Sequence, residues 1–259
     1  MSEQTNWQGK VAIVTGGSAG IGEATALALT ERGANVVITG RDGAKLARVV
    51  DRSVAARSAA IEPVQADSAD PAGGRRMVEA AMDRWGRLDL VVNNAGAGKP
   101  LPIDAYDAET LAEICAVNII APSLLMKEAQ AGLRETKGAV VNIGTAVSQN
   151  AAPGLAHYAA TKAALEHLTR SWAIELAGDG IRVNAVSPGP VKSGALTGMM
   201  GLPPEVAQSI EETEAAQVPL GRRGVTADLV PWILRLGSSA NEWLTAQVIT
   251  IDGGWSLRS

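Results

Sequence analysis

The chain has few of the residues that disulfide-linked proteins and metalloproteins depend on. Of its 259 residues, one is a cysteine, Cys115, and two are histidines, His157 and His167. A single thiol excludes a disulfide framework and a cluster of thiolate metal ligands. Neither histidine belongs to an acidic pattern that resembles a metal site, so no bound metal is predicted.

The chain also lacks the marks of a secreted, membrane-spanning or nucleic-acid-binding protein. Its first ten residues, MSEQTNWQGK, hold no apolar signal-peptide core. No apolar run approaches the roughly 18–20 residues that span a bilayer. The net charge is −4, and the lysines and arginines are scattered. We therefore expect a cytoplasmic protein whose partners include neither nucleic acid nor a membrane.

No Pro- or Ser-rich linker and no internal repeat divides the chain, which predicts one domain over residues 1–259. Short apolar runs alternate with longer Ala-rich segments, a pattern typical of parallel strands and helices in a doubly wound α/β fold. The predicted strands are 11–14, 36–39, 61–66, 88–92, 139–143, 182–186 and 248–251. The predicted helices are 21–31, 44–58, 72–85, 107–133, 156–177 and 227–237. Residues 193–217, rich in Gly, Met and Pro, break this rhythm and predict a lid over a binding site.

A glycine-rich loop follows the first strand and opens the first helix. Its sequence is Thr15-Gly16-Gly17-Ser18-Ala19-Gly20-Ile21-Gly22. Glycines let the backbone approach a pyrophosphate, and the helix N-terminus offers free N–H groups to it. The strand before and the helix after make a dinucleotide site the favoured interpretation, although such glycines elsewhere often only turn the chain.

Arg41 stands where the second strand ends, about 20–25 residues after this loop. A site for NAD would need a carboxylate here for the ribose hydroxyls, and Gly40 provides none. A guanidinium suits the 2′-phosphate of NADP(H). The alternative is a solvated arginine neutralised by Asp42. Asp67 and Ser68, after the third strand, are predicted to contact the adenine, although Asp67 is almost equally suited to cap a helix.

Tyr158 and Lys162 stand one helical turn apart, after the fifth strand. An ammonium favours the phenolate and lowers the pKa of a tyrosine, which can then exchange a proton with a carbonyl or alcohol oxygen. Such a pair is more often an ordinary helix face. Thr145 and Ser148 are both candidates to stabilise the substrate oxygen. Asn118, an unfavourable residue inside a helix, predicts either a local helix irregularity or a water-linked relay to Lys162.

Together these motifs resemble the short-chain dehydrogenase/reductase family, in the branch whose members have roughly 250 residues. The resemblance covers this chain from Lys10 to Leu257. The resemblance rests on TGGSAGIG at 15–22, NNAG at 93–96, Asn118, Tyr158, Lys162, SPGPV at 187–191 and IDGG at 251–254. It implies a Rossmann fold with seven parallel strands in the order 3-2-1-4-5-6-7 and helices on both faces. It also implies an oxidoreductase that works as a homotetramer or homodimer, joined through the Tyr158 helix and the region of the last strand.

The resemblance implies a role for each matching residue. Tyr158 is the general acid/base, Lys162 lowers its pKa and binds the nicotinamide ribose, and Asn118 holds a water. Further cofactor contacts are implied at Asn94, Ala95, Gly96, Pro188, Gly189, Val191 and Ser193. These join the cofactor contacts expected from the loop itself, which are Gly16, Ser18, Ala19, Gly20, Ile21 and Gly22.

Thr145 replaces the serine that the family usually has at this position, and Ala246 departs from a TGQ motif. The predicted function is an NADPH-dependent carbonyl reductase that acts on a ketone or secondary alcohol. Two alternatives remain: a nucleotide-binding scaffold or sensor, which the threonine favours, and an NAD-preferring dehydrogenase.

Overall fold

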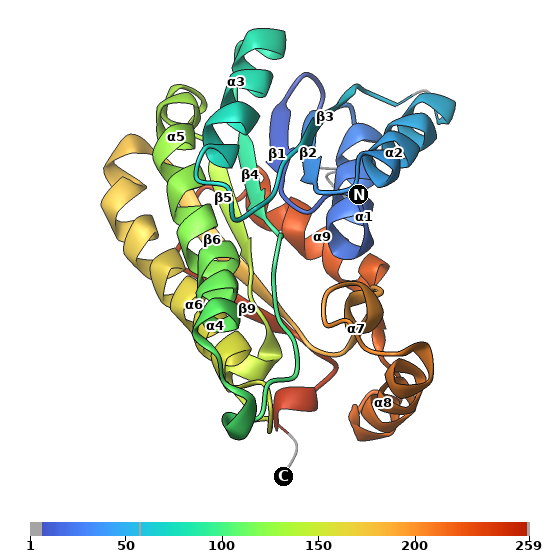
Figure 1. The fold of residues 1–259 in the computed structure, drawn as a ribbon. Helices are drawn as coiled ribbons and strands as arrows, with labels where there is room; N and C mark the ends of the chain where they lie inside the picture. The colour runs from blue at the N-terminus through green and yellow to red at the C-terminus, as the bar shows by residue number, and fades with distance from the viewer. Residues whose placement is uncertain (1–6, 57, 258–259) are drawn as a thin grey trace.

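The centre of the protein is a sheet of seven parallel strands (Figure 1). This computed structural model describes residues 7–56 and 58–257, so the expectation about a signal peptide falls partly outside the described residues. The strands are β1 (Val11–Val14), β2 (Asn35–Gly40), β3 (Ile61–Gln65), β4 (Leu90–Asn93), β5 (Ala139–Ile143), β6 (Arg182–Pro188) and β9 (Val248–Ile251). They lie in the order β3-β2-β1-β4-β5-β6-β9, which confirms the predicted order with β9 as the seventh strand.

Helices cover both faces of this sheet (Figure 1). One face carries α1 (Gly20–Thr30), α2 (Gly43–Ala55) and α9 (Thr226–Gly237). The other carries α3 (Gly73–Trp85), α5 (Ala121–Thr136) and α6 (Ala156–Leu176). Short 3-10 turns lie at Ile103–Ala105, Ala146–Ser148, Ala177–Asp179 and Trp255–Leu257.

Alternate residues of each strand pack on opposite faces. In β1, Ala12 and Val14 join the apolar core under α1 and α9, whereas Val11 and Ile13 join the core under α3, α5 and α6. All four are fully buried. Because both faces are covered, the strands are apolar at almost every position, which is why their positions could be predicted from the sequence.

The predicted helix 107–133 is interrupted around Asn118. The structure has α4 (Ala108–Cys115), a π-helical turn (Ala116–Ile120) and then α5. Pro122 has no N–H, so the α-helical hydrogen bond to the Asn118 carbonyl cannot form. The predicted irregularity is therefore present, and such turns often occur at functional sites.

The composite helix Ala108–Thr136 is, among the described residues, long and apolar enough to cross a membrane by composition alone, with a mean hydropathy of 1.4. The expectation that no such stretch exists was therefore wrong. Its apolar residues have partners within the fold, because Leu125, Ala129 and Leu133 are buried in the core shared with α3 and α6. A core helix that covers a sheet needs the same composition.

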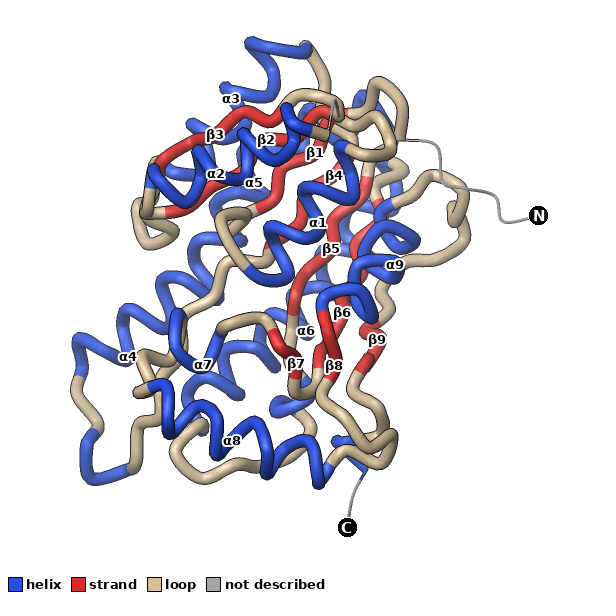
Figure 2. Tube along the Cα trace, turned by 90° about the vertical axis from the view of Figure 1, so that its right-hand side faces the viewer, coloured by secondary structure: helices blue, strands red, loops and turns tan. Residues whose placement is uncertain are grey.

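The predicted lid contains two helices, α7 (Ala195–Gly198) and α8 (Pro204–Gln217), beside one end of the sheet (Figures 1 and 2). A small sheet of β7 (Val191–Lys192) and β8 (Gly224–Val225), which the sequence did not predict, flanks them. Arg223 joins the two parts. Its guanidinium pairs with Glu211 and lies 3.0 Å from Glu214 of α8, and it donates a hydrogen bond of 3.0 Å to the Val191 carbonyl.

Candidate functional site

The glycine-rich loop leaves the start of α1 open. Gly16 and Gly20 have left-handed φ angles of +63° and +58°. A Cβ on Gly22 would lie 2.3 Å from the Gly16 carbonyl oxygen, so no larger residue fits there. Ala19 precedes the helix and makes no side-chain capping bond to its N–H groups. The first turn can therefore offer its N–H groups and positive dipole end to a phosphate.

Thr15 and Asn94 fasten the end of β4 to this loop. The Thr15 hydroxyl accepts hydrogen bonds of 2.9 Å from the N–H groups of Asn94 and Ala95. The Asn94 amide donates to the carbonyls of Thr15 at 2.9 Å and Gly16 at 3.2 Å. The stretch 94–96, predicted from the family resemblance, thus lies directly against the loop. The sequence reasoning gave no role to Thr15, although its position directly before the first glycine is a signal.

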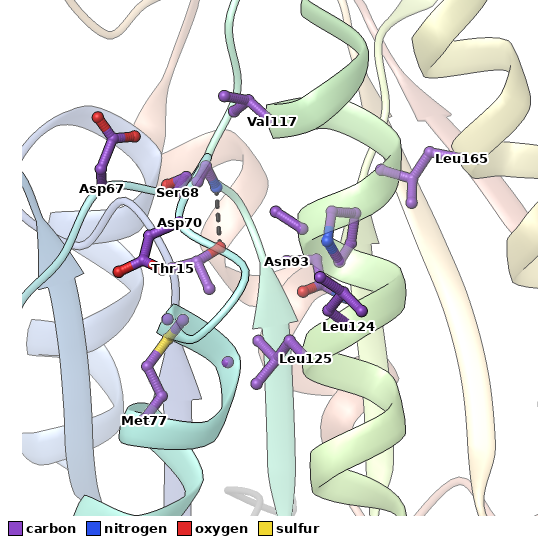
Figure 3. Close-up of a pocket in the computed structure, with 15 residues that line it drawn as sticks. Thr15, Asp67, Ser68, Asp70, Met77, Asn93, Val117, Leu124, Leu125 and Leu165 are labelled. Carbon is purple, nitrogen blue, oxygen red and sulfur yellow. Dashed lines mark hydrogen bonds between the residues drawn. The ribbon is translucent and has the colours of Figure 1, made fainter. Parts of the chain in front are cut away.

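Asp67 and Ser68 lie at a pocket between the end of β3, α3 and α5 (Figure 3). Thr15 and Ala95 line it too, together with a set of apolar residues that includes Val117, Met77 and Leu125. The Asp67 carboxylate accepts only the N–H of Ala69, two residues on, at 2.9 Å. It does not cap α3, and Asp70 instead accepts from Ala72 and pairs with Arg76 at 2.8 Å. Asp67 therefore remains available at this largely apolar pocket.

Arg41 is exposed and, among the described residues, forms no ion pair. The Asp42 carboxylate caps α2 through the Lys45 N–H at 3.1 Å instead. A Cβ on Gly40 would lie 2.9 Å from the Ser18 hydroxyl. Gly40 thus lies against Ser18 at the end of β2, directly before Arg41 in the chain, and offers no carboxylate.

The residues that follow β6 pass beside the glycine-rich loop. The Gly189 N–H donates to the Ile251 carbonyl at 3.0 Å, and a Cβ on Gly189 would collide with Asp252. The Ser193 carbonyl oxygen would lie 2.8 Å from a Cβ on Gly20. The predicted stretch from Pro188 to Ser193, where the lid begins, thus lies beside the phosphate-binding loop.

Thr145, Tyr158 and Lys162 gather at the end of β5. The Thr145 hydroxyl lies close enough to Tyr158 to favour the ionised form of its phenol. The Tyr158 ring packs on Gly98, where a Cβ would lie 2.6 Å from the ring. Ser148, the other candidate, donates toward the Thr145 carbonyl at 2.7 Å and toward Glu166 at 2.9 Å. Of the two candidate hydroxyls, the one beside Tyr158 is that of Thr145.

The electrostatics of this cluster differ from the expectation. Burial raises the pKa of Tyr158 above 10, and the hydrogen bond from Thr145 opposes that rise. The Lys162 ammonium donates to the Ile143 carbonyl at 2.8 Å. Burial lowers the pKa of Lys162 to about 8, with Glu166 acting in the opposite sense. The expected lowering of the Tyr158 pKa by Lys162 is therefore absent here, because desolvation has the larger effect.

Asn118 uses its whole side chain within the protein. Its amide donates to the Ala97 carbonyl at 2.8 Å and to the Thr161 hydroxyl at 2.9 Å, and its oxygen accepts the Ala97 N–H at 2.9 Å. A Cβ on Gly96 would lie 3.5 Å from the Lys162 Nζ and 3.6 Å from the Asn118 Oδ1. Asn118 thus fixes the loop 96–97 beside Lys162.

The described residues contain no group of three or more potential metal ligands. His157 packs edge-on against the ring of Tyr106, with centroids 4.5 Å apart. The aromatic contact accounts for this histidine without a metal.

The comparisons with known proteins agree with this geometry. Residues 16–256 match the family model described as enoyl-(acyl carrier protein) reductase. A 3-oxoacyl-(acyl-carrier-protein) reductase of Thermotoga maritima is 33% identical over 248 residues, covering 95% of this chain and 98% of the relative. A short-chain dehydrogenase/reductase of Cladobotryum sp. is 35% identical over 252 residues, covering 95% of each.

Solved structures give the same result. A Caenorhabditis elegans short-chain dehydrogenase/reductase of unknown function, solved with cofactor, superposes with a TM-score of 0.92 at 32% identity, covering 98% of this chain and 97% of that one. A Mycobacterium marinum member reaches 0.89 at 29% identity, covering 98% of each chain. The chain belongs to the short-chain dehydrogenase/reductase family. It is an oxidoreductase of that nicotinamide-dependent family.

Proposed function

We propose that this protein is an NADPH-dependent reductase of a ketone, or in reverse a dehydrogenase of a secondary alcohol. The observation that carries the proposal is that Thr145 lies beside Tyr158 at the end of β5, with Lys162 one helical turn away. The open start of α1 fits the diphosphate of a dinucleotide. When bound, NADPH supplies the hydride.

The residues of the chain handle the proton. A carbonyl oxygen placed between the hydroxyls of Thr145 and Tyr158 accepts a hydrogen bond from each. The Tyr158 phenol gives its proton as negative charge develops on that oxygen. A raised pKa keeps this phenol protonated at neutral pH, as reduction requires. The Lys162 ammonium can donate a hydrogen bond to a ribose hydroxyl of the cofactor. Pro122 cannot donate the α-helical hydrogen bond to the Asn118 carbonyl, so this carbonyl can hold a water. That water would help to replace the proton that Tyr158 gives up.

The preference for NADPH rests on the end of β2. Arg41 forms no ion pair with a described residue and can pair with a 2′-phosphate, Ser18 contacts the neighbouring Gly40, and Gly40 itself carries no carboxylate. The same features disfavour the NAD alternative, which needs a carboxylate acceptor for the ribose hydroxyls. The expected cofactor contacts therefore remain those predicted from the sequence, with Thr15 added as their support.

The substrate side offers few free polar groups near the loop 147–150. The Gln149 amide donates to the Thr250 hydroxyl at 2.7 Å, and the Asn150 amide donates to the Ser256 carbonyl at 3.0 Å. These side chains, which hinted at a polar ligand, are thus engaged within the protein. We infer a ketone with largely apolar flanks. A 3-oxoacyl thioester belongs among the test compounds because curated relatives are named for that substrate.

The test follows the absorbance of reduced nicotinamide while the protein meets a panel of ketones, with NADPH and NADH in parallel. We expect consumption of NADPH well above that of NADH. Tyr158→Phe should lose at least about 10²-fold in kcat while its NADPH affinity, measured by fluorescence, is retained. Binding of NADPH with no turnover on any ketone would favour the scaffold alternative, whose one support is the threonine at position 145.

We further propose a cytoplasmic homotetramer or homodimer, with no nucleic acid or membrane as a partner. Apolar side chains are exposed on the two regions expected to join subunits: Ile174 on α6 and Trp243 shortly before β9. Light scattering of the purified protein measures the assembly directly.

A further inference from the structure

A buried carboxylate lies one helical turn beyond Lys162 and has no part in the proposed proton transfer. Glu166 is on α6, and only 7% of it is exposed. A carboxylate is costly to bury unless hydrogen bonds or opposite charge compensate for its lost hydration. The groups around Glu166 therefore show what compensates for the cost of burying its carboxylate.

Two serine hydroxyls from different parts of the sheet meet one oxygen of Glu166. Ser187, at the end of β6 and fully buried, donates to Oε1 at 2.5 Å. Ser148, in the turn after β5, lies 2.9 Å from the same oxygen and 2.7 Å from the Thr145 carbonyl. The carboxylate thus connects the loop that carries Thr145 to the strand that leads to the predicted nicotinamide contacts at 188–193.

The loop itself is pressed against this carboxylate. A Cβ on Gly144 would lie 2.8 Å from the Glu166 Oε1 and 2.6 Å from the Ser187 Oγ. Gly144 directly precedes Thr145, so the backbone position of the Thr145 hydroxyl depends on this contact. A small shift here would move Thr145 relative to Tyr158.

The negative charge of Glu166 also stabilises the positive charge of Lys162. Lys162 is 3% exposed and makes no salt bridge to a described residue within 4.0 Å, and its hydrogen bond goes to the neutral Ile143 carbonyl. The groups around it from the other elements are neutral: Gly96 after β4, Asn118 in the π-helical turn and Met199 of the lid. Tyr158, on its own helix, is a neutral phenol with a raised pKa. Among the described residues, Glu166 is the charged group that opposes the desolvation of this ammonium.

We propose that Glu166 is a positioning residue, which holds the Thr145 loop against β6 and maintains the positive charge of Lys162. This rests on the proposed reductase function for its role in turnover. The two effects of Glu166 are separable, because the hydroxyl contacts need an acceptor oxygen and the effect on Lys162 needs a charge.

The test compares Glu166→Gln, which keeps an acceptor oxygen and removes the charge, with the wild type. Without the carboxylate, Lys162 loses its proton at a lower pH than about 8. We expect the alkaline limb of the NADPH affinity, measured by fluorescence titration, to move down by about one pH unit. The alkaline limb of kcat should move with it. The fluorescence measurement needs no substrate, so it tests Glu166 even if no ketone is turned over and the proposed function fails.

Two kinds of control separate charge from structure. Glu166→Asp keeps the charge and should keep the wild-type limb. Ser148→Ala and Ser187→Ala each remove one hydroxyl, and both should lower kcat a fewfold without moving the limb. An unmoved limb in a Glu166→Gln protein with a wild-type melting temperature would overturn the proposal. An equal movement in the two serine variants would overturn it too, because a merely structural role would then explain the result.

Discussion

At the scale of single residues, Arg41 is the side chain on which the choice of cofactor depends. Arg41→Ala removes a charge-assisted contact with the 2′-phosphate, worth about 1.5–3 kcal/mol, so we expect KM for NADPH to rise roughly 10- to 150-fold. The value for NADH should stay unchanged, because NADH has no such phosphate. Steady-state kinetics with both cofactors check this. Arg48→Ala, an exposed arginine on α2, is the matched control. Equal losses with both cofactors would contradict the assignment.

Ala246 is a second residue with a measurable consequence. Its φ angle is +62°, in the left-handed region that favours glycine, and its N–H is bonded to the Val183 carbonyl at 2.8 Å. Ala246→Gly should relieve about 1 kcal/mol of backbone strain. Thermal unfolding should then show a melting temperature higher by about 2–4 °C.

The control for Ala246 is the same substitution in a helix interior. Ala131 is exposed within α5, and Ala131→Gly should lower stability by about 1 kcal/mol. A fall in both variants would show that the backbone at position 246 is not strained.

Which site residues the sequence could predict depended on spacing. Tyr158 and Lys162 stand at a helical interval, and Arg41 follows a strand at the distance that cofactor binding requires. Glu166 carries no such signal, and Thr15 carries only its position directly before the first glycine. Their roles arise from contacts with residues 18 to 80 positions away in the chain, which only the folded sheet brings together.

At the scale of elements, the lid helix α8 depends on one arginine. Arg223 is 4% exposed and bonds to two glutamates of α8 and to β7. Arg223→Met leaves those glutamates without their partner, and α8 should detach from the small β7–β8 sheet. We expect a Glu-specific protease to cut at Glu211, Glu212 and Glu214 roughly tenfold faster, while the melting temperature of the main sheet changes little.

Arg222 provides the control for this experiment. It forms a two-bond pair with Asp228 of α9, on the exposed side of the same turn. Arg222→Met should leave α8 as resistant as in the wild type. Equal cleavage in the two variants would mean that Arg223 does not hold the lid.

The elements that the sequence missed are those without a periodic pattern. β7 and β8 have two residues each, too few for alternation to appear. The irregularity at 116–120 was indicated by Asn118, but nothing in the sequence showed that it is a π-helical turn. Most strands of the main sheet were predictable because they are largely apolar, whereas β3, with Glu62 and Gln65, carries the weaker signal of an edge strand.

At the scale of the whole molecule, the exposed apolar residues lead to a prediction about assembly. If α6 joins subunits, Ile174→Glu places a charge in that interface. We expect sedimentation to show the wild type at about 107 kDa, four times the 26.7 kDa of one chain, and the variant at half or a quarter of that mass.

Val54 provides the matched control for assembly. It is 70% exposed on α2, close to the 76% of Ile174, and α2 is outside the expected interfaces. Val54→Glu should leave the mass unchanged. A wild-type protein at the mass of one chain would contradict the proposed assembly.

The hydrogen bonds from Gln149 to Thr250 and from Asn150 to Ser256 can form only late in the synthesis of the chain. The loop after β5 is translated about a hundred residues before the partners that hold it. At typical rates, that interval is about 5–20 s. During it the strands β1 to β5 have been synthesised, whereas Gln149 and Asn150 still lack these two partners. A nascent chain can therefore form its glycine-rich loop before it fixes the loop beside Thr145.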